Sequence, residues 1–338
     1  MTPKDRVFSA FAHEPPDRVP LWIGASSDFW EHAKAQLSLD EEALRVRLGD
    51  DFRRVFARLP GLPPNTTVMG IERHGLGYGQ PVNHPLADAD LAQIDAYPWP
   101  DPADLDVSHL RAEAWAYGGE YAILGGDWAP FWHDAIDLFG MERLCYLFYD
   151  APELVDAVLV RLVDYYAEAS ARIFDAAAGV IDIYFMGNDY GSQTGPLVSE
   201  GLFKRFLLSH QSRLIHLAHD YGVPAMLHCC GGIAPLIPSL MEAGLDALHA
   251  VQPSARGMDL ATLKREFGAK MVFNGAIDSQ HVLIAGNPAS VREQTRKVLE
   301  IMAPGGGYIA GASHDTILGE TPLENVLAMC DAIREYPN

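Results

Sequence analysis

The stretch Pro224-Ala-Met-Leu-His-Cys-Cys-Gly-Gly232 has the pattern of a buried strand that ends in a histidine, two cysteines and two glycines. Because side chains alternate across a strand, His228 and Cys230 are expected to point to one side and Cys229 to the other. An imidazole and a thiolate on one wall suit a zinc ion. Two ligands do not make a site, so the rest of the chain must supply at least one more.

Further segments have the composition of short buried strands, and helical patterns separate most of them. They lie at residues 18–25, 121–127, 180–186, 247–252, 271–278 and 308–314, and residues 40–60 predict a helix followed by a strand. Strands that alternate with helices in this way predict a parallel sheet. The repeat favours a closed (β/α)8 TIM barrel, which needs roughly 250 residues. We therefore predict a single α/β barrel domain over residues 1–338.

Two segments of the chain are additional to what a minimal barrel requires. Thr2-Pro3-Lys4-Asp5 has the N-cap, the proline and the reciprocal acid of a helix start, so residues 1–15 predict an N-terminal helical extension. Residues 61–104 are dense in proline, glycine and histidine and predict a small antiparallel excursion. This excursion would either cover the mouth of the barrel as a lid or serve as an interaction surface.

The bulk composition argues against several kinds of partner. The formal net charge is −20 over 338 residues, which disfavours nucleic acid because phosphate binding needs clustered lysine and arginine. No run of eighteen apolar residues exists, so we expect no membrane span. Four cysteines are too few for a disulfide scaffold and fit a cytoplasmic location. A homodimer is compatible with this composition.

A barrel gathers the carboxyl ends of its strands at one mouth, where such enzymes do their chemistry. The polar residues at the other predicted strand ends are Asp127, Asn188, Asp189, Gln252, Asp278 and His314. His314 is our candidate for the third zinc ligand, and the alternative is an ordinary histidine of the mouth. Asp189 and Asp278 are alternate ligands and candidate general bases, or else they cap the segments that follow.

Three protein ligands and an open fourth position are the plan of a catalytic zinc site. Zinc in such a site would lower the pKa of a water molecule or of a substrate thiol in the open position. Trp22 is a candidate wall for a planar substrate, and ordinary packing is its alternative role.

Five motifs give the chain a resemblance to the uroporphyrinogen decarboxylase superfamily. They are Pro16-Asp-Arg-Val-Pro20, Gly187-Asn-Asp-Tyr-Gly-Ser-Gln-Thr-Gly-Pro-Leu197, His228-Cys-Cys-Gly231, Asn274-Gly-Ala-Ile-Asp278 and Thr321-Pro-Leu-Glu-Asn-Val326. The resemblance covers most of the length and implies a single (β/α)8 barrel. True decarboxylases of this superfamily carry arginines just after the first strand, where they hold substrate carboxylates. Residues 21–33 contain no arginine, so decarboxylation in the heme pathway is not expected.

The other branch of the superfamily contains methylcobamide:coenzyme M methyltransferases and corrinoid O- or N-demethylases. Its zinc motif, His-x-Cys-Gly, matches His228, Cys230 and Gly231. Its third ligand, a cysteine before the last helix, has no counterpart here, and His314 lies in that region. The resemblance implies a zinc-dependent methyltransferase that moves a methyl group between an O, N or S atom of a small molecule and a corrinoid on a partner protein. The residues expected to bind or orient the substrate are Trp22, Asp127, Asn188, Asp189, Gln193, Gln252 and Asp278.

Two other functions remain open from the sequence. The first is a decarboxylase or lyase that acts without metal on a carboxylated substrate, with Asp189 or Asp278 stabilising charge. The second is a tetrapyrrole-binding protein that has no catalytic activity. Metal analysis would separate the methyltransferase from both.

Overall fold

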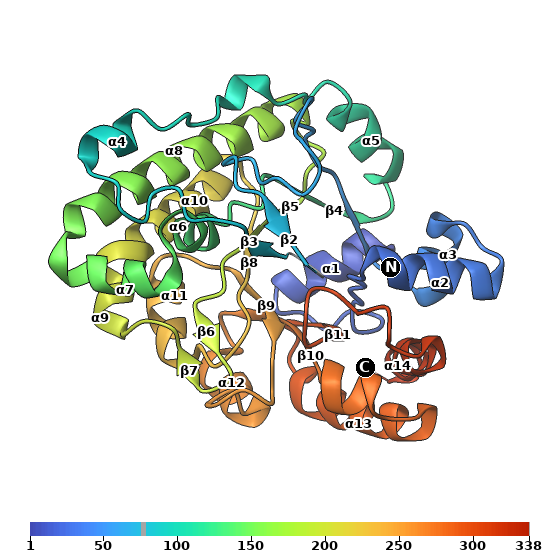
Figure 1. The fold of residues 1–338 in the computed structure, drawn as a ribbon. Coiled ribbons are helices and arrows are strands. Elements are labelled where there is room, and N and C mark those ends of the chain that lie inside the picture. The colour runs from blue at the N-terminus through green and yellow to red at the C-terminus, as the bar shows by residue number, and fades with distance from the viewer. Residues whose placement is uncertain (76–78, 338) are drawn as a thin grey trace.

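The computed structural model describes residues 1–75 and 79–337, and a curved parallel sheet lies at its centre (Figure 1). The strands follow one another in the order β1 (Phe52–Arg54), β4 (Ala122–Gly125), β5 (Ile183–Gly187), β8 (Ala225–His228), β9 (Ala247–Val251), β10 (Val272–Ile277) and β11 (Tyr308–Ala312). Every neighbouring pair in this order is parallel. The predicted α/β class and parallel sheet are confirmed, and the architecture is that of a TIM-barrel-like fold.

The predicted strand at residues 18–25 is not a regular strand of the sheet. In the described chain it makes two isolated bridges, Leu21 with Ala310 and Ala25 with Ile317. Pro20 has no N–H to donate, which shortens any ladder at this point. Backbone hydrogen bonds still connect this inner segment to the start of β1, since Asp51 N–H donates to the Leu21 carbonyl at 2.9 Å. The segment therefore occupies the gap between β11 and β1 without forming an eighth regular strand.

Helices surround the sheet and connect its strands (Figure 1). Those before β4 are α1 (Pro3–Phe11), α2 (Ser27–Leu37), α3 (Glu41–Leu48), α4 (Leu91–Asp95) and α5 (Leu110–Tyr117). Those between β4 and β11 are α6 (Phe131–Phe139), α7 (Met141–Asp150), α8 (Pro152–Ala176), α9 (Glu200–Leu202), α10 (Leu208–Asp220), α11 (Ile237–Glu242), α12 (Leu260–Phe267) and α13 (Pro288–Met302). The last helix is α14 (Leu323–Glu335), and four short helical turns are η1 (Pro102–Asp104), η2 (Phe203–Leu207), η3 (Ala234–Leu236) and η4 (Ser279–Ile284). Within the described residues, none of these helices combines the length and the apolar character that crossing a bilayer requires.

The excursion predicted at residues 61–104 contains an antiparallel ribbon of β2 (Arg73–His74) and β3 (Gln80–Pro81), with α4 after it. Residues 76–78 of this prediction lie outside the described residues. Arg73 Nε donates to Asp137 Oδ2 at 2.8 Å and so joins the ribbon to α6. A second small ribbon, β6 (Gly191–Ser192) with β7 (Gly195–Pro196), follows β5.

Apolar side chains fill the inside of the curved sheet. They come mainly from alternate positions of the strands: Trp22, Phe52, Ala122, Leu124, Ile183, Phe185, Met226, Ala247, Val272 and Ile309. Two side chains of α1 belong to the same cluster. His228 and His249 stand two residues after Met226 and Ala247. The alternation along a strand therefore turns both imidazoles inward at the carboxyl end of the sheet.

Asp51 connects the amino-terminal segments through its side-chain hydrogen bonds, and its removal should lower the stability of the fold. Its carboxylate is 1% exposed and accepts hydrogen bonds from Arg6, Arg18 and the backbone N–H of Leu21. Asp51→Ala is expected to lower the free energy of unfolding by about 3–5 kcal/mol, because it leaves buried charges without their partner. Urea unfolding followed by circular dichroism measures this loss.

The control for Asp51 is Asp17→Ala, which removes another carboxylate bound to Arg6. The Asp17 side chain is 44% exposed, so its removal should cost about 1 kcal/mol or less. Equal losses in the two variants would contradict the central place that the structure gives to Asp51.

Candidate metal centre

A histidine, a cysteine and an aspartate converge at the carboxyl end of the sheet. His228 ends β8, Cys230 follows two residues later, and Asp189 lies in the loop after β5. From His228 Nε2, Cys230 Sγ is 3.3 Å away and Asp189 Oδ1 is 3.5 Å away. One ligand atom of each residue lies within 4.8 Å of those of the others. Imidazole, thiolate and carboxylate are the ligands that zinc takes in proteins.

The sulfurs of the two neighbouring cysteines contact different residues, in keeping with the predicted alternation. Cys229 is buried, and its Sγ accepts the N–H of Tyr190 at 3.2 Å. The backbone N–H of Cys230 donates to Asp189 Oδ1 at 2.7 Å, which ties the cysteine loop to the aspartate. Gly231 has a φ of +88°, and a Cβ at this residue would lie 2.7 Å from the backbone of β6. The loop can fold back over the strand end only because this residue is glycine.

Asp189 carries the negative charge of the cluster. Burial favours its neutral form, but the hydrogen bond from His133 and the nearby His228 outweigh burial and lower the pKa of Asp189. The Nε2 atom of His133 lies 3.4 Å from Asp189 Oδ2. Burial also lowers the pKa of His228 and raises the pKa of Cys230 well above its usual value. A bound divalent ion would reverse the effect on the thiol, because a coordinating thiol loses its proton.

A cavity of about 490 Å³ opens beside this cluster, with Asp189 and His228 in its lining, and its size suits a small molecule. Its described lining residues are Thr67, Val68, Arg73, Gly79, Gln80, Pro81, Asp127, Trp128, Pro130, His133, Asp134, Ile136, Asp137, Tyr166, Asp189, His228, His314 and Asp315. Six of these belong to the excursion at 61–104, whose described part therefore forms one wall of the cavity. Five lining side chains are aspartates, and Arg73 is the only lysine or arginine in this described lining.

Trp128 forms the wall beside the candidate ligands. Its ring centroid lies 5.5 Å from that of His228, and the guanidinium carbon of Arg54 lies 5.0 Å from the centroid of the Trp128 ring. Gly187 at the end of β5 makes room for this ring, because a Cβ there would lie 2.0 Å from Trp128 Cζ2. The small residue in the strand thus places an aromatic surface directly beside the cluster.

His314, the predicted third ligand, lines the cavity but belongs to neither three-residue group found among the described residues, which are Asp189 with His228 and Cys230, and His228 with His249 and Asp315. Its ring centroid is 6.1 Å from that of His228. Its Nδ1 accepts the N–H of Thr316 at 3.0 Å, a local bond that holds the ring in place. The geometry therefore favours the alternate Asp189 over His314 as the third ligand.

Asp278, the second alternate, caps the turn that follows β10. Its Oδ1 accepts the N–H groups of Gln280 and His281, each at 2.8 Å. It lines a separate cavity of about 150 Å³ rather than the larger one. Of the roles that the sequence left open for Asp278, namely metal ligand, general base and cap, the structure shows the cap.

The residues predicted to bind substrate divide between the cavity and its supports. Asp127 lines the cavity, and burial raises its pKa. Trp22 lies instead inside the sheet, where its ring packs edge-on against other aromatic rings. Asn188 is fully buried, and its amide bonds to the backbone of Trp132 and Ala129. Asn188 therefore holds the start of α6 rather than facing the cavity.

Gln193 and Gln252 form a pair that supports the cysteine loop. The amide of Gln193 donates to Gln252 Oε1 at 3.1 Å. The same oxygen accepts the N–H of Gly231 at 3.0 Å. These contacts place both glutamines behind the loop that carries Cys230.

Sequence reasoning missed His133, Asp134 and His249. His249 lies in the middle of β9, and the prediction considered only the end of that strand. Aligning β8 with β9 pairs His228 directly with His249, which is the signal that would have found it. The position of α6 over the cavity brings in His133 and Asp134, and the sequence around them carries no motif.

Asp134 should make the stability of the fold depend on pH. It is buried beside Tyr166, whose hydroxyl donates to Asp134 Oδ2, and burial raises the pKa of Asp134 to about 7. The unfolded chain has the ordinary value near 3.8, so between these two values the folded state binds more protons than the unfolded state. The protein should therefore lose stability as the pH rises from about 4 to 7.

Asp134→Asn cannot ionise and should escape this loss. We expect the melting temperature of the variant, relative to that of the wild type, to rise between pH 5 and pH 8. Differential scanning calorimetry at both values measures the difference, and Asp220→Asn, at an exposed position, is the control. A difference between Asp134→Asn and wild type that does not change with pH would contradict the raised pKa.

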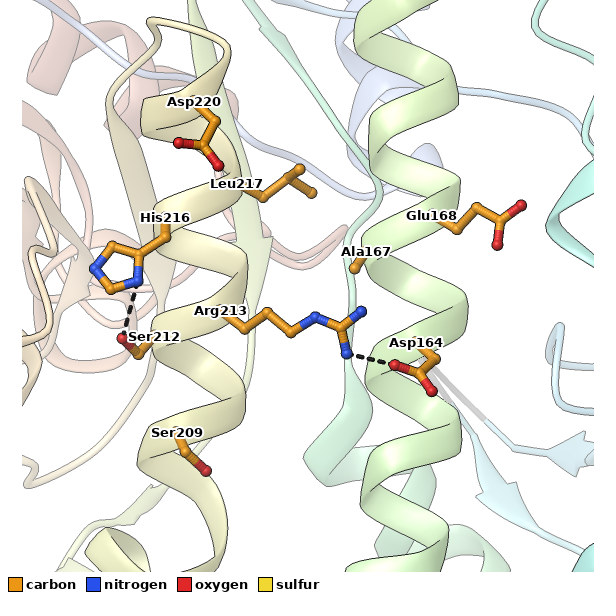
Figure 2. A pocket seen from close by; sticks show the side chains of 9 residues that line it. All are labelled: Asp164, Ala167, Glu168, Ser209, Ser212, Arg213, His216, Leu217 and Asp220. Atoms are coloured by element: carbon orange, nitrogen blue, oxygen red, sulfur yellow. Dashed lines mark hydrogen bonds and ion pairs between the residues drawn. The ribbon is translucent and has the colours of Figure 1, made fainter.

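A larger hollow of about 870 Å³ lies between α8 and α10, and its lining contains none of the predicted site residues (Figure 2). An ion pair between Arg213 and Asp164 crosses it. Both of these side chains are half exposed. The residues that the sequence predicted for the site therefore lie outside this larger groove.

The fold and the cluster together define an α/β-barrel-like protein with a candidate metal centre at its strand ends. The family model described as "Uroporphyrinogen decarboxylase (URO-D)" matches residues 68–336, and the chain belongs to this family. The predicted family is thus confirmed.

Relatives from both branches are similar to this chain over nearly its whole length. The methylcobamide:CoM methyltransferase MtbA of Methanosarcina acetivorans is 22% identical, with 99% of this chain and 98% of the relative covered. The uroporphyrinogen decarboxylase of Thioalkalivibrio sulfidiphilus is 25% identical, with 98% and 97% covered. A solved methyltransferase from Methanosarcina mazei matches with a TM-score of 0.69 at 21% identity and covers 99% of both chains.

Proposed function

We propose that this protein is a zinc-dependent methyltransferase that moves a methyl group between a heteroatom of a small molecule and a corrinoid. The observation that carries the proposal is the approach of Asp189, His228 and Cys230 within 4.8 Å at the edge of a cavity. A thiolate and an imidazole on one wall fit zinc better than they fit a hard cation. Relatives named as methyltransferases support the same reading.

Zinc in this site would act as a Lewis acid on the O, N or S atom that gains or loses the methyl group. Asp189 orients the cysteine loop through the N–H of Cys230. Trp128 and the excursion residues would form the walls around a substrate bound beside the cluster. Asp134 lines the same cavity and accepts a hydrogen bond from Tyr166, and its pKa of about 7 would let it exchange a proton with a molecule bound there.

The charge of the cavity favours methyl transfer over decarboxylation of a porphyrinogen. Five aspartates and one arginine line its described part. A substrate with several carboxylates would meet like charges there, which costs binding energy unless they are neutralised. A small amine, ether or thiol would not meet this repulsion.

The corrinoid would be carried by a partner protein, and the methylcobamide:CoM methyltransferase relatives support this part of the proposal. We also propose a cytoplasmic location. Cys145, Cys229, Cys230 and Cys330 carry no disulfide, which fits a reducing compartment.

Protein purified without chelator tests the proposed function. We expect one zinc per chain, and we expect cob(I)alamin to become methylcobalamin when a methylated amine, ether or thiol is present. The absorbance of the cobalt centre reports the transfer. Release of carbon dioxide from a carboxylated substrate by metal-free protein would instead identify a decarboxylase. Tight tetrapyrrole binding without turnover would identify a binding protein.

A further inference from the structure

His249 stands directly behind the candidate ligand His228. The two residues are paired in the register of β8 and β9. Their Nδ1 atoms lie 3.0 Å apart, which is hydrogen-bonding distance. The exposed fraction is 0% for His249 and 4% for His228, so water does not compete for this contact.

A hydrogen bond between the two Nδ1 atoms needs a single proton, and its position decides what His228 can do. With the proton on His228 Nδ1, the Nε2 atom of His228 keeps its lone pair. That atom is the one that faces Cys230 Sγ at 3.3 Å and Asp189 Oδ1 at 3.5 Å. With the proton on His249 instead, His228 would carry its own proton on Nε2 and could not bind a metal through it.

The surroundings of His249 fix its ring but give it no other hydrogen bond. The rings of Trp22 and Phe185 pack against it with centroid separations of 5.0 Å each. Its Nε2 has no hydrogen-bond partner among the described residues. A buried polar atom without a partner is costly, so a histidine at this position calls for an explanation. Among the described residues the hydrogen-bonding contact of this ring is with His228. An Asp315 carboxylate oxygen also lies within 4.8 Å of ring nitrogens of both histidines.

We infer that His249 is a positioning residue that accepts the Nδ1 proton of His228 and so turns a bare Nε2 toward Cys230 and Asp189. This inference rests on the proposed zinc site. Outer partners of this kind, more often carboxylates or carbonyls, set the orientation and the basicity of a ligating histidine. Here a second imidazole takes that place.

Metal affinity tests this role without an activity assay. His249→Leu keeps most of the bulk and removes the acceptor, whereas His249→Asn keeps an oxygen near the position of Nδ1. We expect His249→Leu to weaken zinc binding about 10–100-fold in competition with a chromophoric chelator. His249→Asn should recover most of that loss.

Cobalt(II) substitution separates a positioning role from direct ligation. At saturating cobalt, His249→Leu should show the same thiolate-to-cobalt and ligand-field absorption as the wild type, because His249 is not itself a ligand. Ile309→Ala controls for a cavity inside the sheet, since Ile309 is a fully buried apolar residue of the same interior cluster. It should lower the melting temperature and leave zinc affinity unchanged.

Two results would overturn the inference while leaving the zinc site intact. One is equal zinc affinity in His249→Leu and the wild type. The other is a changed ligand-field spectrum in His249→Leu, which would make His249 a ligand. Failure of the wild type to bind zinc would remove the proposed function itself, and the role of His249 with it.

Discussion

A His228→Ala/Cys230→Ala double variant is expected to bind no zinc under conditions in which the wild type holds one zinc per chain. The variant removes two of the three side chains whose ligand atoms meet within 4.8 Å. Loss of a single outer partner already costs about 10–100-fold in metal affinity, so loss of two ligands should cost more than about a thousandfold. Mass-spectrometric metal analysis of protein purified without chelator measures the content.

Cys229→Ala is the matched control for this variant. Cys229 stands beside Cys230 in the sequence, but its sulfur faces the opposite side and accepts the N–H of Tyr190. The control should therefore retain its zinc. Zinc retained in the double variant, or lost in Cys229→Ala to the same extent, would show that the metal sits elsewhere or is held by a different set of side chains.

Asp189→Ala is expected to weaken zinc binding at least about 100-fold, as the loss of a ligand exceeds the loss of an outer partner. The carboxylate supplies the third ligand atom and also accepts the N–H of Cys230 at 2.7 Å. Removal of Asp189 therefore takes away one ligand and also frees the loop that carries a second ligand, Cys230. Methyl transfer should fall with the metal, and added zinc should restore part of it.

Asp278→Ala and His314→Ala decide whether Asp189 is the third ligand. Both residues stand after a strand end, as Asp189 does, and both were candidates from the sequence. The structure uses Asp278 as a cap and holds His314 through Thr316. Zinc affinity close to that of the wild type is expected in both variants. A hundredfold loss in His314→Ala with none in Asp189→Ala would assign the third position to His314.

The part of the site that was predictable from sequence is local. Alternation along one strand is enough to place His228 and Cys230 together and Cys229 apart. The strand and helix pattern likewise predicts the parallel sheet, because the hydrophobic periodicity of each element is visible within a short stretch of sequence. The short-range signals at residues 18–25 were misleading, since a strand-like sequence there pairs only through isolated bridges.

The rest of the site depends on contacts between distant segments. Asn188 looked like a strand-end polar group, but it bonds to Trp132, 56 residues earlier in the chain. His249 meets His228 only through the register of two strands. Asp189 is a better candidate than His314 for the third ligand because the cysteine loop folds back onto Asp189. The spacing of residues in the sequence does not predict this contact. Composition and periodicity cannot supply such pairings.

Anomalous diffraction at the zinc absorption edge, from crystals of protein purified without chelator, tests the metal centre most directly. The account predicts one strong peak at the carboxyl end of the sheet, about 2.3 Å from Cys230 Sγ and about 2.0–2.1 Å from His228 Nε2, with Asp189 as the third protein ligand. A fully occupied protein with its zinc peak away from His228 and Cys230, or catalytically active crystals with no peak at all, would contradict it.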